Sequence, residues 1–233
     1  MSKDKTRRLT LFDSTDLAAA EEYFTRMAEK GWLLKKFSLF SLFTRCEPKK
    51  LRFSVQILLP KRRKEYAADV KGYTDLCEEA GWRYLSGYTG MHVFASEKED
   101  VPEIVTDPAE RIAAVSTQSK TGIIALFIAS LVFLPGVIGL FSNLIHGESL
   151  LSQIGYEIPC ALCMTSVLLL ACAKTDAFSK WRSDAEKAAE KGIPIRYFGM
   201  RETRLRTVLF FVVLAAILIA MVLFEIGLRF NAA

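Results

Sequence analysis

The sequence predicts an α+β domain followed by an α-helical membrane domain with three transmembrane helices. Three observations predict this: a repeated helix–Gly–Trp pattern in the first hundred residues, segregation of the charges, and three long apolar stretches. The chain has 233 residues, of which 51% are hydrophobic and 24% are charged. So much apolar surface excludes a disordered chain, and 13 Gly and 7 Pro are too few for collagen-like or low-complexity structure.

The charged residues lie in separate blocks. Residues 1–100 contain 19 Lys and Arg and 15 Asp and Glu, as an ordinary water-soluble domain does. Residues 121–173 contain no Lys or Arg and only two carboxylates, and 207–228 contain one. Between these stretches, residues 174–206 contain nine basic and five acidic side chains. The net charge of +5 and the mean hydropathy of +0.22 are therefore averages over dissimilar parts.

The N-terminal domain, residues 1–100, contains an internal duplication. Met-Ala-Glu-Lys-Gly-Trp at 27–32 is echoed by Cys-Glu-Glu-Ala-Gly-Trp at 77–82, fifty positions later. We expect helices over 15–30 and 64–80, each followed by a glycine in the left-handed conformation that ends helices. An apolar stripe on the first helix marks its buried face, with members Leu17, Ala20, Phe24, Met27 and Ala28.

Four strands are predicted around these helices, at 8–12, 33–45, 51–59 and 82–95. The third alternates apolar and polar residues, which is typical of a half-buried strand. Residues 46–50 are expected to form a hairpin turn. The resulting β-α-β-β-α-β order predicts a ferredoxin-like sandwich, with one sheet face left for a partner, a ligand or the membrane.

The repeated segments resemble a known family. The helix end at 27–32, the Leu-Lys-Lys-Phe strand at 34–37 and the Glu-Glu-Ala-Gly-Trp run at 78–82 are similar to bacterial membrane proteins of the domain of unknown function 2812 family. The resemblance covers about residues 8–97. The resemblance implies no activity, but members are often encoded beside PadR-type transcriptional repressors, which suggests regulation or an envelope response. The third apolar stretch, with its charged insert, departs from the pattern.

The predicted membrane domain occupies 121–233, after a linker and pre-span helix at 101–120. Its spans are expected at 121–145, 154–173 and 207–228, since about 20 apolar residues cross a bilayer. A cytoplasmic amphipathic helix is expected at 176–191, where Phe178 and Trp181 would lie on the membrane or pack against the N-terminal domain. Basic residues favour the cytoplasmic side, which predicts a bacterial inner-membrane protein with its N-terminus inside and its C-terminus outside.

Two groups of residues are candidate ligand sites. Carboxylates in a membrane are costly and often functional, so Glu157 and Glu225, with His146 and Glu148 of the outer loop, are candidates for binding a cation or an amine. The alternative is that both glutamates reach the interface and are hydrated there. For the basic residues, contact with anionic lipid is the hypothesis; these are Lys61, Arg62, Arg63, Lys64, Arg201, Arg204 and Arg206. For the run at 61–64 the alternatives are a solvated turn and nucleic-acid binding.

Cys160 and Cys163 form a C-x-x-C pair of the kind that exchanges disulfides or binds a soft metal. Apolar surroundings suppress the thiolate, so packing between helices is the favoured interpretation. Phosphate-loop, dinucleotide, zinc-protease and nucleophile-elbow motifs are absent from the sequence.

We therefore expect no catalytic residues, no metal and no cofactor. The leading hypothesis is a non-enzymatic regulatory or sensory membrane protein that binds a protein partner, with homo-oligomers possible and no direct contact with nucleic acid. The alternatives are a membrane thiol oxidoreductase that uses Cys160 and Cys163, and an accessory subunit of a transporter or channel that uses Glu157 and Glu225.

Overall fold

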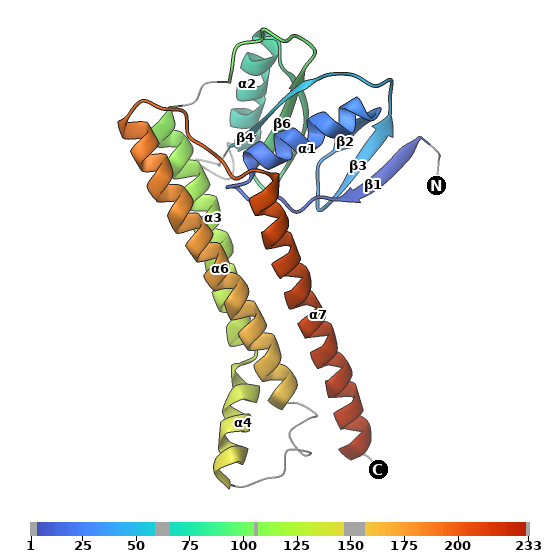
Figure 1. Ribbon diagram of the computed structural model, residues 1–233, viewed down its shortest axis with the longest axis vertical. Helices are drawn as coiled ribbons and strands as arrows, with labels where there is room; N and C mark the ends of the chain where they lie inside the picture. Colours follow the sequence, from blue (N-terminus) through green and yellow to red (C-terminus); the bar gives the residue numbers. More distant parts are fainter. Residues whose placement is uncertain (1–3, 59–65, 105–106, 147–156, 232–233) are drawn as a thin grey trace. The chain divides into compact units, whose positions relative to one another are not determined.

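The computed structural model describes residues 4–58, 66–104, 107–146 and 157–231 (Figure 1). The chain forms two compact units. The first unit comprises Met1–Ser119 and Lys180–Thr203, and the second comprises Lys120–Ser179 and Arg204–Ala233. A segment near the end of the chain, 180–203, thus belongs to the same unit as the N-terminal domain. We call residues 180–203 the return segment.

The first unit is built from two copies of a β-α-β-β motif. The first copy contains β1 (Lys5–Leu9), α1 (Leu17–Glu29), β2 (Trp32–Lys36) and β3 (Phe40–Arg45); the second contains β4 (Arg52–Ile57), α2 (Tyr66–Glu79), β5 (Arg83–Tyr88) and β6 (Met91–Ser96). Each copy forms its own antiparallel sheet, with the strand orders β1-β3-β2 and β4-β6-β5. The fifty-residue repeat of the sequence is therefore a repeat of a whole folded motif with the same strand order.

The predicted ferredoxin-like order was wrong, because two of the four predicted strands are hairpins. Residues 33–45 divide into β2 and β3, and residues 82–95 divide into β5 and β6. The second hairpin turns at Thr89 and Gly90, whose φ values of 47° and 81° are those of a tight type I′ turn. The hairpin predicted at 46–50 was also wrong, since β3 and β4 belong to different sheets and this segment connects them.

Matching features mark the helix-to-strand junctions of the two copies. Gly31 and Gly81 end the helices with φ values of 78° and 95°, as the sequence predicts. Register shifts follow at Leu34/Lys36 and at Tyr84/Ser86, again fifty positions apart. Each junction tryptophan also carries an arginine over its ring: Arg45 over Trp32 at 5.1 Å from Cζ to the centroid, and Arg52 over Trp82 at 5.7 Å. The two arginines come from non-equivalent strands, since position 95, fifty after Arg45, is an alanine, so these cation–π contacts are similar in kind but are not part of the repeat.

We predict that Gly31→Ala destabilises the first unit by about 2 kcal/mol, because the left-handed conformation costs an L-residue roughly 1–2 kcal/mol. A Cβ at this position would in addition lie 2.8 Å from the backbone oxygen of Cys46. Gly72→Ala is the matched control: it lies within α2, where a Cβ meets nothing within 4 Å. That change is expected to stabilise the helix by about 0.5–1 kcal/mol. Urea unfolding of the full chain measures both, and equal effects would contradict the prediction.

The core of the first unit lies under α1, which packs on β2 and β4. The apolar stripe predicted from the sequence is the buried face of this helix. Its central residue, Phe24, is 1% exposed and contacts the rings of Phe12, Phe37, Phe43 and Phe53. A smaller cluster on the second copy contains Cys77, Trp82 and Phe94 with Val101. Both motifs are thus held by aromatic packing.

Among the residues that the structure describes, four helices follow: α3 (Pro108–Leu131), α4 (Leu134–His146), α6 (Glu157–Glu190) and α7 (Met200–Asn231). In the part of the chain that the structure describes, α3 and α6 are long and apolar enough to cross a membrane. Few residues of their apolar windows are buried, and Ile128, Leu131 and Leu169 are more than half exposed. A core helix of a water-soluble protein would bury such residues, so this surface is suited to contact with lipid.

Two predicted boundaries in this region differ from the structure. The helix of the first predicted span, 121–145, is interrupted at residues 132–133, just before Pro135. Proline has no N–H to donate, and its ring clashes with a carbonyl group of the preceding helical turn. The predicted helix at 176–191 is not separate: it is the last part of α6, which runs without interruption from the apolar into the charged segment. Its predicted end is confirmed, since Gly192 with a φ of 63° follows the helix. The third predicted span falls within α7.

Candidate functional site

A cavity of about 600 Å³ lies within the first unit. Five parts of the chain form its walls: the start of α1, strand β4, Trp82 just before β5, residues 103–111 and the return segment. Ligand pockets in proteins commonly have volumes of about 300–1,000 Å³, so this cavity is large enough for a small molecule. Its polar wall residues are Glu21, Arg52, Ser54, Gln56, Glu103, Arg111, Arg196 and Tyr197.

Glu21 projects from the buried side of α1. Its Oε1 accepts a hydrogen bond from the backbone N–H of Val55 at 2.8 Å, which joins the helix to β4. Burial raises the pKa of this carboxyl group from 4.5 to about 7, although the Val55 bond and the nearby Arg111 and Arg52 oppose the shift. The group therefore changes its ionisation near neutral pH, in a wall of the cavity.

Arg111 and Tyr197 meet at the wall that the return segment provides. The Arg111 guanidinium carbon lies 5.8 Å from the centroid of the Tyr197 ring, and its Nη2 donates to Gln56 Oε1 at 3.2 Å. Arg111 Nε and the Tyr197 hydroxyl are both buried and have no hydrogen-bond partner among the described residues. A buried donor without a partner costs about 1–3 kcal/mol. Two unsatisfied donors in one cavity wall indicate that an acceptor belongs there.

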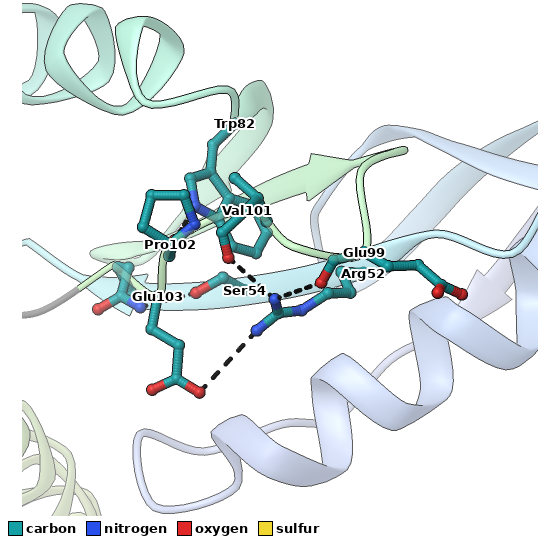
Figure 2. Close-up of polar contacts among 8 residues, drawn as sticks. Arg52, Ser54, Trp82, Glu99, Val101, Pro102 and Glu103 are labelled. Carbon is teal, nitrogen blue, oxygen red and sulfur yellow. Dashed lines mark hydrogen bonds and ion pairs between the residues drawn. The ribbon is translucent and has the colours of Figure 1, made fainter.

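Arg52 fixes another wall by holding the segment after β6 (Figure 2). Its Nη1 donates to the backbone oxygens of Glu99 at 3.0 Å and Val101 at 2.9 Å, and its Nη2 lies 3.9 Å from Glu103 Oε1. Beside it, Trp82 Nε1 donates to the oxygen of Pro102 at 2.8 Å. Arg52 and Trp82 thus both donate to backbone oxygens of residues 99–102, and this segment precedes Arg111 in the chain.

The return segment is held by an aromatic contact between its own two ends and by a backbone hydrogen bond to the N-terminal domain. Trp181, which is 2% exposed, stacks on Tyr197 with 5.8 Å between ring centroids. The next residue, Phe198, donates its backbone N–H to Thr15 O at 2.9 Å. Of the two predicted positions for Trp181, packing within the unit that contains the N-terminal domain is the one observed.

The predicted carboxylate cluster is not assembled among the described residues. Glu157 accepts a hydrogen bond from Asn143 Nδ2 at 2.7 Å, which joins α6 to α4. His146 is exposed, and its Nδ1 lies 2.7 Å from the oxygen of Ser142 in its own helix. Glu148 and the side chain of Glu225 lie outside the described residues. The polar partner of Glu157 is therefore an amide that the sequence analysis did not single out.

Of the other predicted site residues, some lie within the described residues and some lie outside them. Cys160 and Cys163 lie one turn apart on α6, the first half-buried and the second buried, and both are free thiols. Arg201 and Arg204 are exposed at the start of α7, whereas Arg206 is half-buried. The run at 61–64, with Lys61, Arg62, Arg63 and Lys64, lies outside the described residues.

The residues of the cavity were not predicted, and only one of them left a signal in the sequence. Glu21 lies four residues after Leu17 and three before Phe24, so it occupies the apolar stripe of α1. A carboxylate at such a position is costly unless it has a function or a partner. Arg111 and Tyr197 lie 86 positions apart, and no spacing rule joins them.

Among the described residues, no group of three or more His, Cys, Asp or Glu is arranged to hold a metal ion. Residues 16–127 match the family described as protein of unknown function (DUF2812). The family resemblance carried by the helix–Gly–Trp segments is thereby confirmed, and the match extends beyond residue 97 into α3. It includes every wall of the cavity except the return segment. No curated protein and no solved structure matches the chain.

Proposed function

We propose that this chain, whose residues 16–127 belong to the DUF2812 family, is a non-enzymatic regulatory or sensory protein of the bacterial inner membrane. The first unit receives a signal, and the apolar helices anchor it in the membrane. One observation carries the proposal: the return segment, which connects the apolar parts of α6 and α7, belongs to the first unit. Any change in that unit that displaces the return segment therefore acts directly on α6, a candidate membrane helix, and on α7, which contains the predicted third span.

The contacts of the return segment support a role in transmission. Tyr197 packs between Trp181 and Arg111, and α7 begins only three residues after it. The Gly199 N–H donates to Glu202 Oε2 at 3.2 Å, which is the arrangement of a capping box at the start of α7. Because Tyr197 and the cap are so close in sequence, a displaced Tyr197 would alter the first turn of α7.

Orientation and partner form part of the same proposal. The nine basic residues at 174–206 and the basic N-terminal domain favour a cytoplasmic position for the first unit, with the C-terminus outside. A protein partner is the proposed receiver of the signal. Phe40 at the β2–β3 hairpin is 58% exposed and pairs with Leu9, which is 40% exposed, and these side chains offer an apolar contact on the first unit.

The test is Trp181→Ala in the full chain, reconstituted in lipid nanodiscs. Loss of the stacked ring is expected to loosen the return segment, because a buried Trp→Ala change removes about 3–5 kcal/mol of packing. Hydrogen exchange should then become faster at 193–199 and, by transmission, in the first turns of α7 at 200–208. Arg182→Ala is the matched control, since its side chain is exposed on the next position of the same helix.

Two results decide the proposal. Faster exchange in both segments for Trp181→Ala, with no change for Arg182→Ala, supports transmission through the return segment. Faster exchange that stays confined to 193–199 would overturn it, because α7 would then be indifferent to the state of the first unit.

A further inference from the structure

The cavity of the first unit combines two features that rarely occur together without a ligand. It is about 600 Å³ in volume, and two buried donors in its wall residues, Arg111 Nε and the Tyr197 hydroxyl, lack a partner among the described residues. Both atoms donate hydrogen bonds, and the guanidinium group cannot accept one. The missing group is therefore a hydrogen-bond acceptor, and an acceptor with two oxygens would satisfy both donors.

The charges of the cavity favour an anionic acceptor. Arg111 carries a fixed positive charge in the wall, and Gln56, its protein partner, is neutral. The opposing carboxylate, Glu103, is 84% exposed and lies near Arg52. Glu21 is the remaining buried acid, and at neutral pH it is only partly ionised. A planar guanidinium with a free Nε–H matches the geometry of a carboxylate.

The other residues that line the cavity indicate the chemical character of the rest of the ligand. Leu17, Trp82, Ile104, Ile195 and Pro108 line the same cavity and offer only apolar or aromatic surface. Ligand sites typically combine such walls with a few polar groups that fix orientation. An apolar body attached to one carboxylate fits this division.

We propose that the cavity binds a small monocarboxylate with an apolar body, whose carboxylate accepts hydrogen bonds from Arg111 and Tyr197. This ligand is the signal of the proposed regulatory function. Its role as a signal rests on that function, whereas the binding site does not. Since Tyr197 belongs to the return segment, an occupied cavity holds that segment against the first unit. Binding itself is measured without any regulatory readout.

The test is calorimetric titration of the full chain in nanodiscs with two matched pairs of probes: benzoate against benzamide, and hexanoate against hexanamide. Each carboxylate should bind at least about tenfold more tightly than its neutral amide, because charged hydrogen bonds are roughly twice as strong as neutral ones. Equal binding of the members of both pairs, or binding of inorganic phosphate in preference to every carboxylate, would overturn the proposal.

Tyr197→Phe separates binding from folding. This change removes an unsatisfied buried hydroxyl and keeps the ring that stacks on Trp181. We expect an unchanged or higher melting temperature together with carboxylate binding weakened about tenfold. Tyr88→Phe is the matched control, because Tyr88 is 41% exposed and does not line the cavity. If Tyr197→Phe binds the carboxylates as the unaltered chain does, the proposed site is wrong.

A pH series provides an independent readout. The charged or titratable groups around Glu21 are Arg52 on β4, Glu103 before α3, Arg111 on α3, and Tyr197 on the return segment. Glu21, with a pKa of about 7, is the group among them that titrates between pH 6 and pH 8. Its ionisation adds a negative charge to the wall, and carboxylate affinity should fall several-fold as the pH rises. In Glu21→Gln that dependence should disappear; an equal dependence in both chains contradicts the assignment.

The results distinguish this inference from the proposed function. If no carboxylate binds but Trp181→Ala still alters exchange in α7, the ligand class is wrong and the regulatory proposal stands. If carboxylates bind as expected but α7 is indifferent to Trp181→Ala, the site stands and the transmission fails.

Discussion

Replacing Phe24 with alanine is expected to destabilise the first unit by about 3–5 kcal/mol, the range for the loss of a fully buried phenylalanine. The ring is 1% exposed and contacts five other aromatic rings, from α1 itself, both sheets and their connections. No neighbour fills the resulting space easily, since the surrounding rings are held on several sides by α1, by β3 and β4 and by the connections between elements. Because a typical domain is stable by only about 5–15 kcal/mol, much of that stability would be lost.

Urea unfolding of the full chain, followed by tryptophan fluorescence, measures this effect. Leu76→Ala is the matched control: Leu76 is 66% exposed on α2, so its truncation should change the free energy of unfolding by less than about 0.5 kcal/mol. A Phe24→Ala chain as stable as the control would show that the core does not depend on this ring.

The second large effect is a dependence of stability on pH through Glu21. Its pKa is about 7 in the folded chain against 4.5 for the free group, chiefly because of burial. Between these values the folded state holds a proton that the unfolded state releases, so the free energy of unfolding falls as the pH rises. The shift from 4.5 to about 7 corresponds to about 3–4 kcal/mol, at about 1.4 kcal/mol per pKa unit. The loss is complete above pH 7.

Glu21→Gln tests this prediction directly. The amide oxygen can still accept the Val55 N–H bond, but the side chain cannot ionise. Urea unfolding at pH 5 and pH 8 should therefore show a smaller loss of stability in the variant, with the difference between the two chains approaching about 3 kcal/mol. If both chains lose equal stability over this range, Glu21 is not the group responsible.

The sequence pattern was sufficient to predict features that depend on residues close together in the chain. The spacing of Leu17, Phe24 and Ala28 predicted the buried face of α1, and Gly31 and Gly81 predicted the ends of both helices. The number of strands was harder to predict from the sequence, because an apolar run of this length is compatible both with one long strand and with the two strands of a hairpin. The Gly-Tyr-Thr-Gly sequence at 87–90 contained the turn of the β5–β6 hairpin. The turn is defined by the positive φ of two consecutive residues, which only the structure shows.

By itself, the sequence determined the charged and apolar blocks, the fifty-residue repeat and the family, since composition and local periodicity are properties of adjacent residues. Tertiary structure alone decided that the repeat forms two separate sheets and that the return segment joins the first unit. It also decided the cavity, whose polar residues come from positions as distant as 21, 111 and 197. Packing brings such residues together without any fixed spacing along the chain, so no pattern in the sequence records the site beyond the carboxylate of Glu21 on the apolar stripe of α1.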